Sequence, residues 1–313
     1  MILLQTKGDK EMINVTLVGT GGMVPLPGRY LASCHIEYNG KAILIDCGEG
    51  TQISLQKGKI SLNKIETILI THCHADHVTG LPGLLLTIGN HGRTDPLNII
   101  APRGSTKIIN SLLIVCGYLP YEVRISELHD SKSEEFSQIG LNITSIPLKH
   151  HINCLGYSLE LKLKPHFQPE EAKKLNIPVN FWRLLHKGEK VVVDNKTITP
   201  DMVLGSPRNP IKISYVTDSR PVKSIAEIVK YSDIFICEGM YGDDEMLSGA
   251  VEKMHMIYSE AANIALNANV KELWLTHFSP SMPFPSEYIE SASKIFTNTV
   301  IGRDLMSKTL KSE

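Results

Sequence analysis

The sequence predicts a layered α/β protein. Short runs rich in aliphatic and β-branched residues alternate with loops and helical patterns along most of the chain, and this alternation is typical of layered α/β folds. The 313 residues are 42% hydrophobic and 21% charged, so the chain can bury a large core, and this composition argues against a disordered or fibrous protein. No internal repeat or low-complexity tract interrupts the pattern.

The predicted elements follow a polar leader of about a dozen residues. Each predicted strand is an apolar run that ends at a glycine or a polar cluster. The strands are expected at residues 13–19, 35–38, 41–46, 67–71, 97–101, 141–146, 211–216, 234–237 and 272–276. Helices are expected at residues 50–57, 81–88, 106–116, 222–231, 259–268 and 286–296.

Charge and cysteine content restrict the class of protein. The 32 Lys and Arg nearly balance the 33 Asp and Glu, which excludes a generally basic or acidic surface but leaves room for a local patch. No apolar run approaches the roughly 18–20 residues of a membrane helix. The six cysteines are scattered without a CxxC pair, and the short apolar stretch that opens the sequence is not expected to be a signal peptide. We therefore expect reduced thiols in a cytoplasmic protein without a membrane segment.

Residues 156–196 differ from the rest in charge. This segment holds eight Lys and Arg against five Asp and Glu, a balance of +3 in a chain of −1. Pro165, Pro169 and Pro178 break any continuous helix there. Taken alone, such a segment is typical of a solvated insertion.

The strongest chemical signal follows the predicted strand at 67–71. His72, His74, Asp76 and His77 fall within six residues, and His72 and His74 alternate, so both project from one side of an extended segment. Imidazole and carboxylate groups are the ligands that suit Zn²⁺ or a similar divalent ion. The cluster therefore predicts a metal site.

Further candidate ligands stand at the ends of later apolar runs. They are His150 or its neighbour His151, Asp218 and His277. A lone His or Asp at a strand end is usually a turn or cap residue. Downstream of the first cluster we interpret these residues as additional ligands, because active-site groups of α/β sheets gather at strand ends.

These residues resemble the motifs of the metallo-β-lactamase superfamily, and within it of the ribonuclease Z family. The resemblance covers residues 13–303, and it rests on the following segments: Gly19-Thr-Gly-Gly, Leu44-Ile-Asp-Cys-Gly-Glu-Gly-Thr-Gln52, His72-Cys-His-Ala-Asp-His-Val-Thr-Gly-Leu-Pro-Gly83, Gly156-Tyr, Val216-Thr-Asp-Ser-Arg-Pro221 and Leu275-Thr-His-Phe-Ser279. The family spacing of six residues before Gly156-Tyr selects His150 over His151.

The resemblance implies a four-layer αββα metallo-β-lactamase sandwich. It would be a single domain over residues 13–303, with a protruding arm inserted at about residues 160–192. One metal would be held by His72, His74 and His150, the other by Asp76, His77 and His277, with Asp218 bridging both and Asp46 orienting the ligating histidines. Zn²⁺ is the favoured ion, and the same ligands accept Mn²⁺.

The activity implied by the resemblance is endonucleolytic removal of the 3′ trailer from tRNA precursors, leaving a 3′-OH on the tRNA. Asp76 would also take a proton from the nucleophile. His255 resembles the family histidine that protonates the leaving group or holds the phosphate, and Glu238 would orient it. The partners implied are a tRNA precursor, whose phosphates the basic arm would contact, and a second copy in a homodimer.

Three segments depart from the family pattern. The arm reads Asn176-Ile-Pro-Val-Asn-Phe181, no arginine follows His277 in Ser279-Pro-Ser-Met282, and Met-Ile follows His255. All three lie where RNA would be held, and none contains a predicted metal ligand. Two alternatives therefore stay open: a small-molecule phosphodiesterase or sulfatase-type hydrolase on the same site, and a metal-dependent RNA-binding protein without catalysis.

Overall fold

The computed structural model describes residues 11–312. These residues form two compact units, one made of residues 11–160 and 211–311 and the other of residues 161–210. Most of the expected polar leader falls on residues 1–10, outside the described residues. Among the residues described, no helix is long and apolar enough to cross a membrane.

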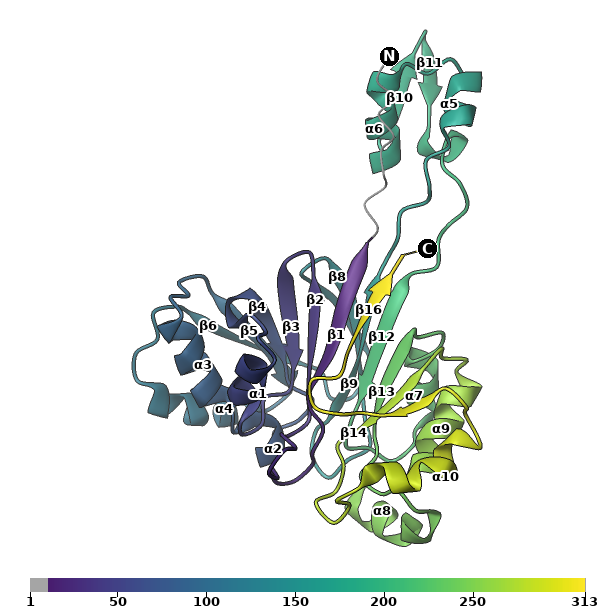
Figure 1. Cartoon of the computed structure of the whole chain (residues 1–313). Coiled ribbons are helices and arrows are strands. Elements are labelled where there is room, and N and C mark those ends of the chain that lie inside the picture. The colour runs from purple at the N-terminus through teal and green to yellow at the C-terminus, as the bar shows by residue number, and fades with distance from the viewer. Residues whose placement is uncertain (1–10, 313) are drawn as a thin grey trace. The chain divides into compact units, whose positions relative to one another are not determined.

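Two seven-stranded mixed sheets form the centre of the first unit (Figure 1). The first sheet has the order β16-β1-β2-β3-β4-β5-β6, with β1 at Met12–Gly19, β2 at Ser33–Tyr38, β3 at Lys41–Ile45, β4 at Ile65–Leu69, β5 at Leu97–Pro102, β6 at Val123–Leu128 and β16 at Ser307–Lys311. The second sheet has the order β15-β14-β13-β12-β9-β8-β7, with β7 at Glu134–Gln138, β8 at Leu141–Pro147, β9 at Leu155–Leu161, β12 at Ile211–Val216, β13 at Ile234–Glu238, β14 at Leu273–Thr276 and β15 at Thr299–Ile301.

The two sheets pack face to face. The hydroxyl of Tyr157 on β9 donates to the carbonyl of Ile70, just after β4, at 2.7 Å. Side chains such as Val15 and Tyr215 are fully or almost fully buried. This inner layer excludes water because alternate residues of both sheets point into it.

Helices cover the outer face of each sheet (Figure 1). Next to the first sheet lie α1 (Thr51–Lys57), α2 (Ala75–Val78), α3 (Leu81–Asn90) and α4 (Ser105–Leu113). Next to the second lie α7 (Lys223–Ile228), α9 (Tyr258–Asn267) and α10 (Ile289–Ser293), whereas α8 (Leu247–Lys253) lies beyond the ends of its strands. Their apolar residues join two separate outer cores, for example Leu85 with Ile68 in one and Ala261 with Phe235 in the other. The predicted four-layer αββα architecture is confirmed.

Some strands lacked a clear sequence signal. β6 has a largely exposed face, and β16 reads Ser-Lys-Thr-Leu-Lys with only Leu310 buried. Both are edge strands, and an edge strand can be polar because only part of it faces the core. β16 pairs antiparallel with β1 and so extends the first sheet beyond residue 303, the expected end of the domain.

The second unit has a small core of its own. It contains α5 (Pro169–Lys174), α6 (Val179–Lys187), β10 (Val191–Val193) and β11 (Lys196–Ile198). Leu185 on α6 packs in a cluster with Ala172, Ile177 and Val203, and the indole N–H of Trp182 donates to the Ile177 carbonyl at 3.0 Å. Burial of apolar side chains therefore stabilises this unit. Its limits of 161–210 are wider than the expected arm of about 160–192.

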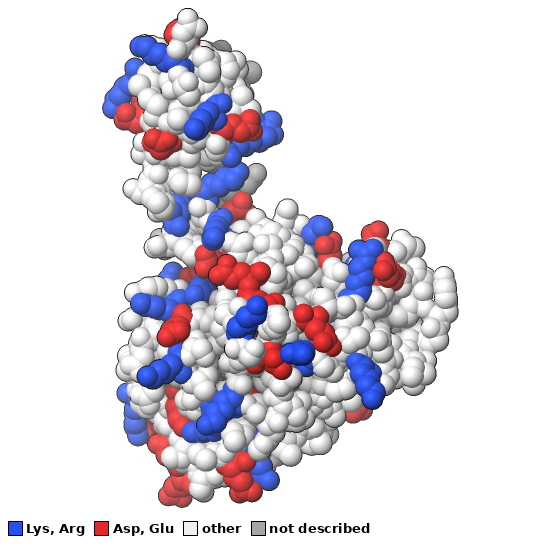
Figure 2. Space-filling view, turned by 180° about the vertical axis from the view of Figure 1, so that it is seen from behind, with Lys and Arg blue, Asp and Glu red and all other residues white. Residues whose placement is uncertain are grey.

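Charge distinguishes the second unit from the first. Residues 161–210 carry nine Lys and Arg against five Asp and Glu, whereas the rest of the chain carries 23 against 28. The local balances are therefore +4 and −5. Figure 2 shows Lys and Arg side chains spread over the surface of this unit.

Candidate metal centre

The candidate site lies where strands of both sheets end. Asp46 directly follows β3 and His277 directly follows β14, whereas one residue separates Asp218 from the end of β12. All three residues adopt a left-handed backbone, with φ of 59°, 46° and 57°. This conformation is uncommon for residues other than glycine, and such outliers concentrate at functional sites. Each sharp turn directs a side chain toward the same space.

A first group of ligand atoms gathers around Asp218. His72 Nε2 lies 2.9 Å from His74 Nδ1, which in turn lies 3.2 Å from His150 Nε2. Oδ2 of Asp218 lies 3.6 Å from His72 Nε2 and 3.9 Å from His150 Nε2. The structure thus brings His150 into the group, whereas His151 is exposed.

A second group contains the remaining predicted ligands. His77 Nε2 and His277 Nε2 lie 3.2 Å apart, and Oδ2 of Asp76 lies 3.6 Å and 3.4 Å from them. Oδ1 of Asp218 lies 3.5 Å from His77 Nε2 and 3.3 Å from His277 Nε2. Asp218 therefore presents one carboxylate oxygen to each group.

Neighbouring polar groups orient the histidines. Oδ2 of Asp46 lies 2.8 Å from His77 Nδ1, and the same carboxylate accepts the backbone N–H and the hydroxyl of Thr71. His150 Nδ1 faces the carbonyl of Met254 at 3.3 Å. In both rings Nδ1 contacts a polar group outside the ligand cluster, so Nε2 faces the other ligand atoms. Metal-binding histidines are commonly oriented in this way.

The electrostatics favour a cation in this space. Burial opposes protonation of His77, but the carboxylates of Asp218 and Asp46 outweigh it and raise its pKa to about 10. Burial would raise the pKa of Asp218, yet the surrounding histidines hold it well below its usual value. The buried carboxylates therefore make this a site that attracts positive charge.

The donor set fits divalent metal binding. The ligand atoms of His72, His74, His150 and Asp218 lie within 4.8 Å of one another, as do those of Asp76, His77 and His277. Imidazole nitrogens and carboxylate oxygens in sets of three and four match the coordination of first-row divalent ions.

His255 and Glu238 form a second buried pair beside the ligands. His255 Nδ1 lies 2.9 Å from Oε2 of Glu238, and it lies 4.0 Å from Oδ2 of Asp218. Oε1 of Glu238 accepts the backbone N–H of Ser219 at 2.6 Å. Burial opposes protonation of His255, but Glu238 outweighs it and raises the pKa to about 9.

Close backbone contacts explain the glycines of the motifs. A Cβ on Gly80 would lie 1.9 Å from the carbonyl oxygen of Gly48, and a Cβ on Gly48 would lie 2.1 Å from that of Asp76. A Cβ on Gly22 would lie 2.8 Å from the ring of His277. Glycine is needed at these positions because larger residues would push the ligand loops apart.

Several residues that hold the site residues in place were not predicted from the sequence. The backbone N–H of Met23 donates to Oδ2 of Asp76 at 2.7 Å. Arg220 binds the carboxylate of Glu260 and the carbonyl of His255, and its place in Thr-Asp-Ser-Arg-Pro was an available signal. Such contacts join segments far apart in the chain.

The segment after His277 is held by an arginine from elsewhere. Arg29 donates to the carbonyls of Met282 and Pro283 at 3.0 and 2.8 Å. It also donates to the carbonyl of Ser279 at 3.4 Å. The sequence offered no signal for this contact, because the two segments lie about 250 residues apart.

The chain is similar to known proteins over nearly its full length. It is 50% identical to ribonuclease Z of Clostridium kluyveri, with 96% of this chain and 99% of the relative covered, and 48% identical to ribonuclease Z of Clostridioides difficile, with 96% and 99% covered. A family model described as anti-Pycsar protein Apyc1 matches residues 13–168.

Solved structures show the same fold. Human tRNase Z, short form, superposes with a TM-score of 0.68 at 23% identity, covering 94% of this chain and 98% of that one. The metallo-β-lactamase fold protein YhfI from Bacillus subtilis gives a TM-score of 0.70 at 17% identity, covering 96% and 100%. With close sequence relatives along its whole length and this fold, the chain belongs to the ribonuclease Z family.

Proposed function

We propose that this protein is a metal-dependent endoribonuclease that removes the 3′ trailer from tRNA precursors and leaves a 3′-OH on the tRNA. Family membership supports the reaction and the substrate. The observation that carries the proposal is the position of Asp218 between two groups of ligand atoms, with one carboxylate oxygen facing each. A phosphodiester hydrolase can use such a site to hold two divalent ions side by side.

The ions proposed are two Zn²⁺, with Mn²⁺ as an accepted substitute. One would be held by His72, His74 and His150 and the other by Asp76, His77 and His277, with Asp218 shared, as the two sets of ligand atoms support. When bound, such a pair lowers the pKa of water and stabilises charge on the phosphate oxygens.

The chain's own groups would move the protons. Despite burial, His277 and His77 hold the pKa of Asp76 below its usual value, so the group is ionised at neutral pH. In this proposal the Asp76 carboxylate accepts the proton of the attacking water. The Met23 N–H fixes its Oδ2. His255, oriented through Nδ1 by Glu238, would donate a proton to the leaving 3′ oxygen.

The second unit is proposed to bind the tRNA body. Its balance of +4 in a chain of −1 supports contacts with phosphates, which position a nucleic acid without reading its sequence. Nothing in this role requires a metal ligand, and the cluster of His and Asp ligand atoms lies entirely in the first unit.

A homodimer is proposed through the first unit. Helices α3 and α4, with the 3-10 turn Ile114–Cys116, present large exposed apolar side chains. Ile114, Val115 and Tyr118 are 77%, 73% and 85% exposed. Large apolar side chains exposed within one short segment are typical of a protein interface, and a single-charge substitution such as Val115→Glu should convert dimer to monomer in light scattering.

The test compares two substrates. Purified protein loaded with Zn²⁺ should cut a 3′-extended tRNA precursor at the 3′ side of the tRNA body and also hydrolyse bis(p-nitrophenyl) phosphate. Hydrolysis of the small substrate without cleavage of the precursor would replace the proposal with a small-molecule phosphodiesterase. Loss of both activities in a metal-loaded, folded protein would favour an RNA-binding role.

A further inference from the structure

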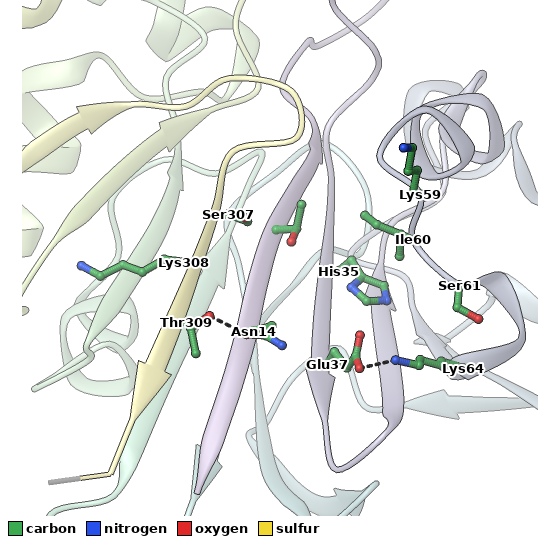
Figure 3. A pocket seen from close by; sticks show the side chains of 11 residues that line it. Asn14, His35, Glu37, Lys59, Ile60, Ser61, Lys64, Ser307, Lys308 and Thr309 are labelled. Atoms are coloured by element: carbon green, nitrogen blue, oxygen red, sulfur yellow. Dashed lines mark hydrogen bonds and ion pairs between the residues drawn. The ribbon is translucent and has the colours of Figure 1, made fainter. Parts of the chain in front are cut away.

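A polar cleft lies on the helix-facing side of the first sheet, and none of its lining residues is a predicted metal ligand. It has a volume of about 290 Å³ and is lined by side chains from β1, β2, β16 and the turn after α1 (Figure 3). Asn14 lines it from β1, where its neighbours Ile13 and Val15 are buried between the sheets. The cleft is therefore a feature of the outer face, separate from the ligand cluster.

The carboxylate and the side-chain amide in this cleft each already accept one hydrogen bond. The carboxylate of Glu37 accepts from the ammonium of Lys64 at 2.5 Å, and Oδ1 of Asn14 accepts from the hydroxyl of Thr309 at 2.7 Å. The amide N–H groups of Asn14 then remain as donors. Lys59 lines the cleft without an ion-pair partner among the described residues. What the cleft offers to a ligand is thus mainly positive charge and N–H groups.

His35 adds an unpartnered buried group. It is 2% exposed, and its Nε2 has no hydrogen-bond partner in the described part of the chain. Figure 3 shows the imidazole projecting from β2 toward Ile60 and Lys64. Burial lowers the pKa of His35 to about 4, so the ring is neutral at pH 7 and can supply one N–H. Buried polar atoms without a partner are uncommon in folded proteins, and each calls for an explanation such as a bound water, ion or ligand.

We propose that this cleft binds a phosphate group through the Lys59 ammonium, the Asn14 amide and the His35 Nε2–H. Charge-assisted hydrogen bonds of this kind are the strong ones in anion recognition. A volume of about 290 Å³ lies near the lower end of small-molecule sites. It suits one phosphate with a small organic part, supplied either by a free mononucleotide or by an RNA backbone.

The test reads the site directly at His35. The ring nitrogens of the histidines in the full-length, Zn²⁺-loaded protein are observed by NMR, and the His35 signals are identified by their loss in His35→Gln. Inorganic phosphate, adenosine monophosphate and a short single-stranded oligonucleotide are titrated separately, up to about 10 mM for the small molecules, ten times a dissociation constant of about 1 mM. A saturating shift of His35 Nε2 is expected, and the ligand that produces it at the lowest concentration identifies the source of the phosphate.

Two lysine variants separate this site from general charge. Lys59→Gln should weaken binding at His35 by about tenfold or more, since a hydrogen bond to a charged group is lost. Lys57→Gln removes an exposed lysine two residues away that does not line the cleft, and it should leave binding unchanged. Hydrolysis of bis(p-nitrophenyl) phosphate should be equal in both variants.

Three results would overturn the proposal. The first is a His35 ring that none of the three ligands shifts. The second is an equal loss of binding in Lys57→Gln and Lys59→Gln. The third is a parallel loss of hydrolysis in Lys59→Gln, which would assign the phosphate to the metal site instead.

Discussion

The ligand cluster of the first unit depends on the exact positions of a few atoms, whereas the basic second unit depends on its total charge. In the cluster, Asp218 is 3% exposed and faces five imidazoles within about 4 Å. In the second unit, the Lys and Arg residues are largely at the surface around a small apolar core. One region therefore relies on individual atoms in fixed positions, and the other on a sum of charges, so single substitutions should affect them very differently.

The largest effect is expected for Asp218→Ala. This change removes the oxygens that face both groups of ligand atoms, and the stabilisation of the transition state by the two proposed metals, worth several kcal/mol, should be lost. Cleavage of the tRNA precursor and hydrolysis of bis(p-nitrophenyl) phosphate should both drop by at least about a thousandfold.

Metal content provides the second measurement for this variant. Mass spectrometry of the purified protein should show fewer than two ions per chain in Asp218→Ala and two in Asp95→Ala, which removes an exposed carboxylate elsewhere. Full activity of Asp218→Ala with one tightly bound ion would contradict the two-metal site.

Deletion of the second unit should separate the two activities. This unit connects β9 to β12, which are neighbours in the second sheet, so residues 162–209 can be replaced by a short Gly-Ser link. Binding of the tRNA precursor should weaken by orders of magnitude and lose much of its salt dependence, because several phosphate contacts are removed. Hydrolysis of bis(p-nitrophenyl) phosphate should persist, and its loss in a folded, metal-loaded variant would mean that this unit shapes the active site.

A moderate effect is expected for Asp46→Asn. The amide cannot accept from both Thr71 and the His77 ring as the carboxylate does, so His77 should be less firmly oriented. Metal affinity should fall about 10–100-fold, as it does for other residues that support a ligand. Competition with a chelator of known affinity measures this change, and an unaltered affinity would show that packing alone holds His77.

The smallest effect is expected for single lysines of the second unit. Lys190→Ala removes one exposed ammonium among nine basic residues. Affinity for the tRNA precursor should fall by less than about tenfold, and the slope of log K against log salt should change by about one. Binding measured at several salt concentrations tests this, and a loss as large as that of the full deletion would indicate one specific contact instead of summed charge.

Much of the candidate site can be predicted from neighbouring residues in the chain. His72, His74, Asp76 and His77 fall within six residues, so their geometry is largely local. His150, Asp218 and His277 can be proposed because each ends an apolar run, but their convergence depends on the order of strands in two sheets. Without the family spacing, nothing local distinguishes His150 from His151.

The sequence by itself determined the α/β class, the type of metal chemistry and the basic character of residues 156–196, because composition and periodicity are local properties. Only the tertiary structure decided which oxygen of Asp218 faces which histidines, and that Arg29 holds the segment after His277. It also decided that β16 closes the edge of the first sheet, and that His35 lies buried without a partner among the described residues. These features arise from contacts between residues far apart in the chain, whose distances depend on how the two sheets pack and which strands become neighbours.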